Sequence, residues 1–383
     1  MKKLVLILVV FALIATPVFS QISIGGMIET YGILGTGDFN TQKEIDDIKT
    51  NGDWGLDIAV TAVNLPRTAG GKAVLVNGRH IWAYGWWKPS NILFLKTGNI
   101  FEDSTWAADD ISGLGFHANK FDIVRPLEAY AGNVLRLGHG FYLPTIELGV
   151  DPSMQLTLSP IDGLDFNIAV PFQKRGVRNT ITDTYVGNLH FQAVYYFDGI
   201  GEAAVSFINS PDSNDQEIAA KRIFAQWRMS FGANMRLELG VNYDLSGQTE
   251  TSNNHPDRPI NFGLGFGMGN LETGDPMVIN IRLGASIPSI DTDNTLFGFD
   301  VLFSYDLGIF RLYLPVGLGL VLPSAGDPLV AWSFAPYLTK SFLGPYLFFG
   351  FNIYNGSRTG DLITNLNDVN LNWSIPIGLR WDF

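Results

Sequence analysis

The strongest constraint on the fold of this 383-residue chain is a strict two-residue alternation of apolar and polar side chains. Residues 370–383 show it most clearly, because every second residue there is bulky and apolar. This apolar set is Leu371, Trp373, Ile375, Ile377, Leu379, Trp381 and Phe383. A period of two is the signature of a β-strand, so the segment is predicted to be a strand with one apolar and one polar face.

The same alternation returns in segments of about ten residues that are separated by turns or polar loops. The pattern predicts about eighteen strands, and sixteen or twenty are also compatible with it. The predicted strands are 22–34, 54–64, 72–77, 79–87, 91–99, 153–160, 163–171, 184–197, 201–209, 219–230, 234–246, 260–269, 276–286, 296–306, 309–322, 329–340, 343–354 and 369–383.

A soluble β-sandwich and a membrane-spanning β-barrel both contain such strands, and one strand alone does not separate them. Strand length of about ten residues, aromatic residues at the strand ends, and alternation of short turns with long loops favour the barrel. The short turns are 87–91, 160–163, 198–201, 231–234, 306–308 and 340–344, and the longer loops lie near 172–184, 209–219, 246–259, 287–295 and 355–369. The predicted fold is an all-β, transmembrane antiparallel β-barrel with short periplasmic turns and longer external loops.

The first twenty residues predict export. Lys2 and Lys3 precede an apolar run from Leu4 to Ile14, and small residues precede Gln21. This pattern is typical of a cleaved secretory signal peptide at 1–20, with a membrane anchor as the alternative. The apolar run is shorter than the roughly 20 residues that a helical span needs. Residues 21–383 are then expected to form a single barrel domain.

Composition argues against several other functions. Without Lys2 and Lys3 the chain keeps 23 of its 25 basic residues against 37 acidic ones, so its net charge changes from −12 to −14. This acidity argues against a nucleic-acid partner and predicts a mild preference for cations. There is no cysteine, which excludes disulfides and a lipidated cysteine. No nucleotide-binding motif or nucleophile elbow is present, and the histidines lack metal-binding spacing, so we expect no enzyme activity, metal or cofactor.

Several segments resemble the bacterial outer-membrane porin family, including the porin-like proteins of spirochaetes. Residues 25–32 resemble the first porin strand, and residues 83–98 resemble the hairpin before the third external loop. Trp381 and Phe383 resemble the aromatic signal that such barrels present to the outer-membrane assembly machinery.

The resemblance implies a protein of the bacterial outer membrane that contacts the lipid bilayer, forms a homo-trimer and lets small hydrophilic solutes and ions diffuse through a water-filled channel. An adhesin or surface antigen built on the same barrel, with little channel activity, is the alternative.

Residues 100–150 form the longest stretch without a clear strand pair, and the resemblance implies that this loop folds into the lumen. Four acids in it are candidates for the acidic side of a pore constriction: Glu102, Asp103, Asp109 and Asp110. A solvated loop tip and a contact for a divalent ion are the alternatives.

Five arginines fall on the polar faces of predicted strands: Arg222, Arg228, Arg236, Arg282 and Arg311. They either form a basic wall across the lumen from the acidic loop, or they pair with acids such as Glu238, Asp244 and Asp300 to satisfy a polar interior. Arg236 and Arg311 lie near short turns, which predicts a place at the periplasmic mouth. Arg222 and Arg282 are the mid-barrel candidates.

Overall fold

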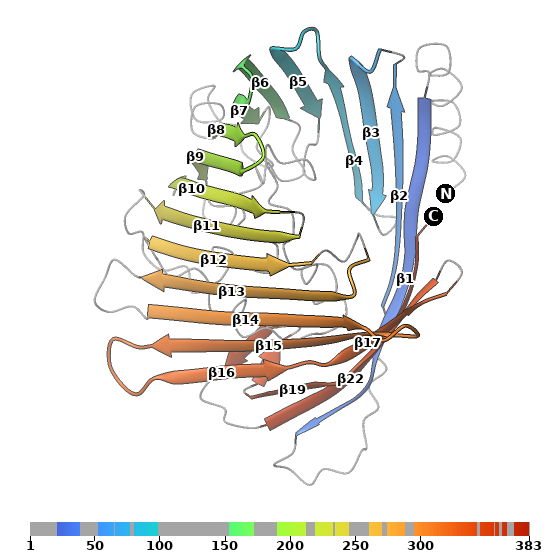
Figure 1. Cartoon of the computed structure of the whole chain (residues 1–383), viewed down its shortest axis with the longest axis vertical. Coiled ribbons are helices and arrows are strands. Elements are labelled where there is room, and N and C mark those ends of the chain that lie inside the picture. Colours follow the sequence, from blue (N-terminus) through green and yellow to red (C-terminus); the bar gives the residue numbers. More distant parts are fainter. Residues whose placement is uncertain are drawn as a thin grey trace.

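The computed structural model describes most of the predicted strands and leaves out several connections. The described residues are 21–38, 53–64, 66–76, 80–98, 153–171, 190–211, 219–232, 234–244, 260–269, 274–287, 295–342, 345–355, 357–359, 362–365 and 371–382. The predicted signal peptide and the predicted lumen loop lie outside these residues. All regular structure within them is β-strand (Figure 1). None of the described residues belongs to a helix long and apolar enough to cross a membrane.

Strands follow one another along the whole described chain. The first eleven are β1 (Gln21–Asp38), β2 (Asp53–Val63), β3 (Ala69–Val76), β4 (His80–Trp87), β5 (Leu93–Gly98), β6 (Ser153–Ile161), β7 (Leu164–Pro171), β8 (His190–Phe197), β9 (Gly201–Pro211), β10 (Ala219–Phe231) and β11 (Met235–Asp244). The others are β12 (Ile260–Met268), β13 (Met277–Ile287), β14 (Thr295–Asp306), β15 (Arg311–Leu322), β16 (Leu329–Phe334), β17 (Tyr337–Ser341), β18 (Pro345–Gly350), β19 (Asn352–Asn355), β20 (Ser357–Thr359), β21 (Leu362–Asn365) and β22 (Leu371–Asp382).

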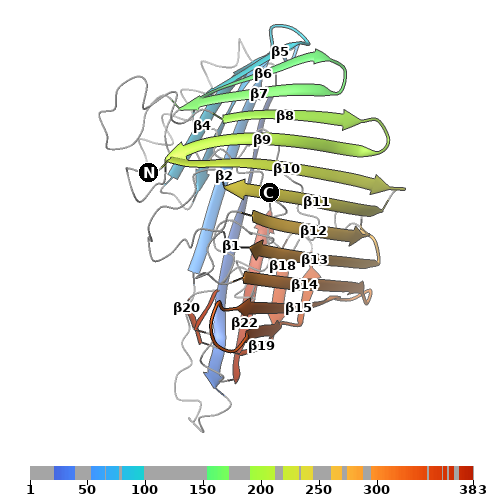
Figure 2. The ribbon, with the colours of Figure 1, turned by 90° about the vertical axis from the view of Figure 1, so that its left-hand side faces the viewer.

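Strand pairing is antiparallel and returns to its starting point. Each strand from β1 to β15 pairs with its successor, and β22 pairs with β1. Figure 2 shows β5 to β15 side by side in chain order, with β1 and β2 on the far side. In the described residues each strand of this ladder therefore has a partner on both sides, which satisfies backbone groups within the sheet.

Two predicted strands are interrupted. β16 and β17 both pair with β15, and β18 and β19 both pair with β22. At the first break Pro336 lacks the N–H that a continuous ladder needs, and its carbonyl accepts a hydrogen bond from the N–H of Phe351 at 2.9 Å. Within the described residues, the 20-stranded sheet has eighteen spans when each interrupted strand is counted once; the sequence predicted about eighteen, with sixteen or twenty also compatible. The predicted loop 355–369 was wrong in one respect, because β20 and β21 form a short hairpin there.

Short turns share one end of the barrel. Because neighbouring strands are antiparallel, every second connection lies at the same end, and this set consists of the turns after β2, β4, β6, β8, β10, β12, β14 and β17. Five of these turns contain a glycine with positive φ, and Gly163, Gly199, Gly232, Gly274 and Gly308 are examples, one in each turn. Such φ values are costly for residues with a Cβ, so glycine permits the tight reversal. The opposite end carries the longest connections, including 99–152 and 172–189.

Burial is inverted relative to a soluble protein. In β13, Val278 and Asn280 are 1% exposed, whereas Met277 and Leu283 are 38% and 41% exposed. We call the buried face of the sheet the inner face and the exposed, apolar face the outer face. The buried polar or charged residues are Gln155, Asn167, Gln192, Ser206, Gln226, Arg228, Asn280, Ser304, Ser333, Thr339, Asn352 and Ser374. A soluble sandwich would bury its apolar face, so the outer face needs apolar surroundings.

A charge placed on the outer face tests this reading. Leu283 lies near the middle of β13. Leu283→Arg should lower the free energy of unfolding by about 2–4 kcal/mol, because that is the cost of a cation at the bilayer midplane. The measurement is a denaturant titration of protein refolded into phosphatidylcholine vesicles. The matched control is Leu307→Arg in the exposed β14–β15 turn, which should cost about 0–1 kcal/mol. Equal losses at both positions would contradict a membrane-spanning outer face.

Candidate functional site

A ladder of uncharged polar side chains crosses four strands of the inner face. Thr157 Oγ1 on β6 donates to Asn167 Oδ1 on β7 at 2.6 Å. Asn167 Nδ2 donates to Gln192 Oε1 on β8 at 3.0 Å, and Gln192 Nε2 donates to Ser206 Oγ on β9 at 3.1 Å. The register places each pair directly across neighbouring strands. Each amide donates to one neighbour and accepts from the other, so this part of the wall is polar without carrying charge.

An ion pair continues the inner face on the next strand. Arg228 Nη1 on β10 donates to Glu202 Oε1 on β9 at 2.7 Å, and the two side chains are only 9% and 13% exposed. Gly201 brings β9 close at this point, because a Cβ added there would lie 1.9 Å from the Arg228 carbonyl oxygen. The short distance and the low exposure make this a buried pair in which each charge compensates the other.

Acidic and basic positions alternate along the register row that contains this pair. Glu202, Arg228 and Glu238 are register neighbours on β9, β10 and β11. After a glycine on β12, the row continues with Arg282 on β13 and Asp300 on β14. The side chains of Glu238, Arg282 and Asp300 lie outside the described part of the structure. At the level of backbone register each arginine of this row has an acidic neighbour, which favours charge pairing.

A row of glycines runs beside these charged positions. Gly240, Gly263, Gly284, Gly298 and Gly319 occupy matching register positions on β11 to β15. Because glycine has no side chain, the row adds nothing that projects into the interior. No side chain therefore narrows the interior of the barrel at these positions, which lie beside the row of alternating charges.

The outer face carries a hollow over the same strands. Its volume is about 900 Å³, and bulky apolar residues such as Trp227, Phe262 and Phe299 line it. Trp227 and Phe262 also belong to the exposed apolar face. The hollow thus faces the surroundings of the barrel and takes no part in a passage through it.

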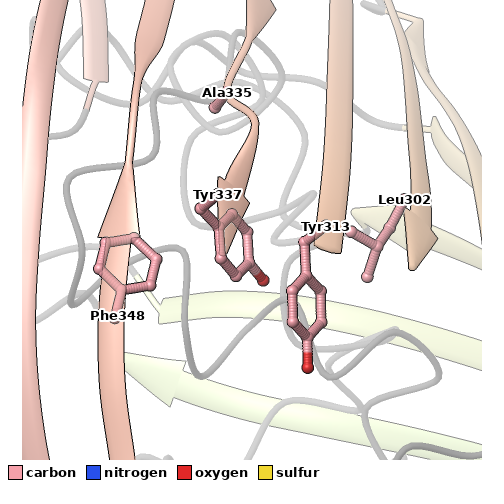
Figure 3. Packing of buried hydrophobic residues seen from close by; sticks show 5 residues of the cluster. All are labelled: Leu302, Tyr313, Ala335, Tyr337 and Phe348. Atoms are coloured by element: carbon pink, nitrogen blue, oxygen red, sulfur yellow. The ribbon is translucent and has the colours of Figure 1, made fainter. Parts of the chain in front are cut away.

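Aromatic packing covers another sector of the inner face, on β14 to β18. Figure 3 shows Tyr337 between Tyr313 and Phe348, with Leu302 beside Tyr313. The rings of Tyr313 and Tyr337 stack with centroids 4.4 Å apart and planes 6° apart, and the centroids of Tyr337 and Phe348 are 4.9 Å apart. All four residues are at most 4% exposed. This sector is a packed wall, in contrast to the polar ladder on β6 to β9.

Three of the predicted arginines have described side chains. Arg228 is the buried partner of Glu202. Arg236, in register with Ser230 beside the β10–β11 turn, is partly exposed. Arg311 opens β15, where its Nε donates to Ser304 Oγ at 2.7 Å and its Nη2 donates to the Asp275 carbonyl. Arg236 and Arg311 therefore lie beside short turns, and their place at the periplasmic mouth stays a prediction.

The other two arginines are placed by backbone only. Arg282 is central in β13, and its role as a mid-barrel residue of the lumen stays a prediction. Arg222 instead lies toward the long-loop end of β10, in register with Asp244 at the last position of β11. Their side chains are outside the described residues. The structure therefore leaves the basic wall a prediction.

The predicted acidic constriction also stays a prediction, because Glu102, Asp103, Asp109 and Asp110 lie outside the described residues. Trp381, the described member of the predicted assembly signal, is 45% exposed on the outer face, and Phe383 is not described. Within the described ranges, no group of three or more histidine, aspartate or glutamate residues is placed to hold a metal ion.

Sequence reasoning missed the partner of Arg228 and the polar ladder. Glu202 alternates with Ala203 and Val205, so its place on a polar face was visible in the sequence. Its pairing with Arg228 was not, because that contact depends on the register of β9 with β10 across 26 residues. The same holds for Asn167 and Gln192, which are 25 residues apart.

Removing one charge of the buried pair should destabilise the barrel. Glu202→Gln keeps the shape but leaves the Arg228 cation without its carboxylate, and the expected loss is about 3–5 kcal/mol of unfolding free energy. Equilibrium unfolding in vesicles measures it. Adding Arg228→Gln should recover part of the loss. The control is Asp198→Asn in the exposed β8–β9 turn, with a change within about 0.5 kcal/mol. A loss at Glu202 no larger than at Asp198 would show that the pair contributes little.

Comparisons with known proteins place this architecture among solved structures. No family model matches the chain, and no curated protein matches it. OccK1 (OpdK) of Pseudomonas aeruginosa superposes with a TM-score of 0.53 at 10% identity, over 96% of this chain and 100% of that one. OccAB4 of Acinetobacter baumannii gives 0.52 at 10% identity, over 95% and 98%. OccK11 (OpdR) of Pseudomonas aeruginosa gives 0.51 at 11% identity, over 96% and 97%.

At these identities the likeness is one of fold. OpdK is described as an outer membrane protein. The resemblance to spirochaete porin-like proteins stays a prediction. The superposed architecture and the antiparallel ladder agree with the predicted all-β fold, and this chain shares that fold with these solved structures.

Proposed function

We propose that this protein is a passive channel of the bacterial outer membrane for small hydrophilic solutes and ions. One observation carries the proposal: bulky apolar side chains are exposed on the outer face, while the buried polar side chains lie on the inner face, beside apolar sectors such as that of Tyr313 and Tyr337. That distribution suits a barrel with lipid outside and a polar lumen inside.

The dimensions of the sheet support a pore. Barrel diameter grows with strand number, and about 16–18 strands leave an aqueous channel. The ring of eighteen spans, with two interrupted strands counted once each, falls in this range. The glycine row keeps one register position across β11 to β15 free of side chains.

The lining chemistry suits passage rather than reaction. The described ladder consists of hydroxyl and amide groups that hydrogen-bond to one another. Such groups can exchange hydrogen bonds with hydrated solutes, and diffusion requires no catalytic step. The proposal therefore assigns no enzymatic activity to the chain.

The same proposal names the partners. The outer face contacts the lipid bilayer, and exposed Trp381 near the end of β22 belongs to the signal read by the outer-membrane assembly machinery. Association into a homo-trimer is proposed from the porin resemblance.

Channel recordings test the function. Purified protein in a planar bilayer should produce discrete current steps whose size rises in proportion to salt concentration, because a water-filled pore conducts with the mobility of the bulk solution. Swelling of liposomes that contain the protein should be fast for small sugars and slow for large ones. Correctly folded protein that inserts but stays electrically silent would overturn the proposal in favour of a surface-binding barrel.

Narrowing the glycine row gives a second test. Gly284→Trp adds a large side chain on the inner face of β13 and should reduce the size of each current step, because it occupies lumen width. Leu283→Trp is the matched control, since the neighbouring residue projects from the outer face. Equal step sizes in the two variants would contradict the assignment of the lumen to the inner face.

A further inference from the structure

The hollow on the outer face has a floor of small residues and a rim of large ones. It has a volume of about 900 Å³ and crosses β9 to β15, which lie side by side (Figure 2). Trp227 and Phe262, which are 39% and 44% exposed, project from its rim. The floor is low because the side chains of three of its residues end at Cβ: Ala203, Ala225 and Ala285. Four members of the glycine row reach it with their backbone: Gly240, Gly263, Gly284 and Gly298.

The lining of the hollow is apolar. Among the described residues that line it, none is charged, and Gln226 is the one with a polar side chain. Gln226 belongs to the buried polar set, so its side chain lies on the inner face, away from the hollow. A bound water molecule needs about two to four polar partners, so a hollow of this kind suits hydrocarbon rather than water.

One register row runs through the hollow from end to end. It leads from Ala203 on β9 through Trp227, Leu239, Leu264, Leu283 and Phe299 to Leu318 on β15. Ala203 is the third residue of β9, counted from the β8–β9 turn, whereas Leu318 is the eighth residue of β15, counted from the β14–β15 turn.

This difference makes the hollow climb through the membrane. Both turns belong to the short-turn end of the barrel, so the row rises by about five residues, or about 13 Å along the membrane normal for strands tilted by about 40°. Half of the hydrocarbon core is about 15 Å thick. The hollow therefore begins near the short-turn end and spans about the depth of one leaflet.

A tyrosine stands where the row begins. Tyr195 on β8 is in register with Ala203 and is 39% exposed on the outer face. Its ring meets the edge of the Phe197 ring, with centroids 4.7 Å apart. A tyrosine at a membrane interface combines an apolar ring with a hydroxyl that reaches the head groups. The row thus leads from a side chain that can hydrogen-bond to a lipid head group into an apolar hollow.

We propose that the hollow binds one phospholipid, with an acyl chain across β9 to β15 and the head group beside Tyr195. The inference rests on the membrane location in the proposed function and names a defined lipid site on the outer face. The surrounding bilayer is as apolar as the hollow, so the hydrophobic effect does not favour this place over any other. Van der Waals packing of the chain between the alanine floor and the aromatic rim provides the preference.

The lining favours a lipid over a second barrel. Proteins that associate within a bilayer rely on close packing and on hydrogen bonds between them. The described lining offers a second barrel no side chain for such a hydrogen bond. A flexible acyl chain can follow a floor that climbs across several strands, whereas the side chains of a second barrel are held by their own sheet.

Lipid retention tests the site. Protein refolded into vesicles of palmitoyl-oleoyl phosphatidylethanolamine is extracted into detergent, and native mass spectrometry counts the phospholipids that stay on each barrel. The wild type should retain one. Ala225→Trp fills the floor and should lower the retained fraction by about fivefold or more, because the chain loses its packing contacts. The matched control is Ile223→Trp, which adds the same indole to the outer face of β10 outside the lining and should keep the wild-type fraction.

Two further variants locate the lipid. Tyr195→Phe keeps the ring but removes the hydroxyl, and it should lower the retained fraction by about twofold or more. A phospholipid with a brominated acyl chain should quench the fluorescence of Trp227, measured as the difference between the wild type and Trp227→Phe. Equal quenching of the two proteins would contradict a chain in the hollow.

The outcomes separate this inference from the channel function. Equal retention by Ala225→Trp and Ile223→Trp would overturn the lipid site. A wild-type assembly of several barrels without lipid would also overturn it, because a second copy would then fill the hollow. Current steps in a planar bilayer show that each variant has folded. Wild-type protein that conducts but retains no phospholipid rejects the lipid site alone, and protein that retains phospholipid without conducting rejects the channel function alone.

Discussion

Backbone hydrogen bonding is the constraint on which the rest of this structure depends. A chain whose outward side chains are apolar has no water on that side, so each N–H and C=O in the wall must find its partner within the sheet. The antiparallel ladder from β1 through β15 to β22, and from β22 back to β1, serves this requirement because each of its described strands has a partner on both sides. At the break between β16 and β17, the Pro336 carbonyl also has a partner, because it accepts a hydrogen bond from the N–H of Phe351.

Because the ladder returns to β1, the sheet has an inner face, and the residues on that face set the chemistry of the interior. Every second residue must point inward, and the interior residues differ from sector to sector. On β6 to β9 they form a neutral ladder, on β9 and β10 a buried ion pair, and on β14 to β18 stacked aromatic rings. Lys72 on β3 and Lys96 on β5 add basic side chains that remain partly exposed. In the proposed channel, a wall with such different sectors gives a solute an uneven electrostatic path.

Much of the fold was predictable because alternation is a local property. The predicted strand 219–230 corresponds to β10 and the predicted strand 276–286 to β13, each within a residue or so at its ends. The break between β16 and β17 was not predicted, although Pro336 stood in the sequence, because the surrounding apolar residues continue the alternation across it. The candidate site was less predictable. Arg228 was identified as an inward residue, but Glu202 was not recognised as its partner.

The sequence by itself determined which residues form strands and which side chains share a face, because a two-residue period needs no information from elsewhere in the chain. It also determined that a polar face and an apolar face coexist along the chain. The tertiary structure decided which face is buried and which residues meet across strands. Lys72 and Lys96 are separated by two strand crossings, and Asn167 meets Gln192 only through the register of β7 with β8. Register arises from the pairing of whole strands, so no single segment encodes it.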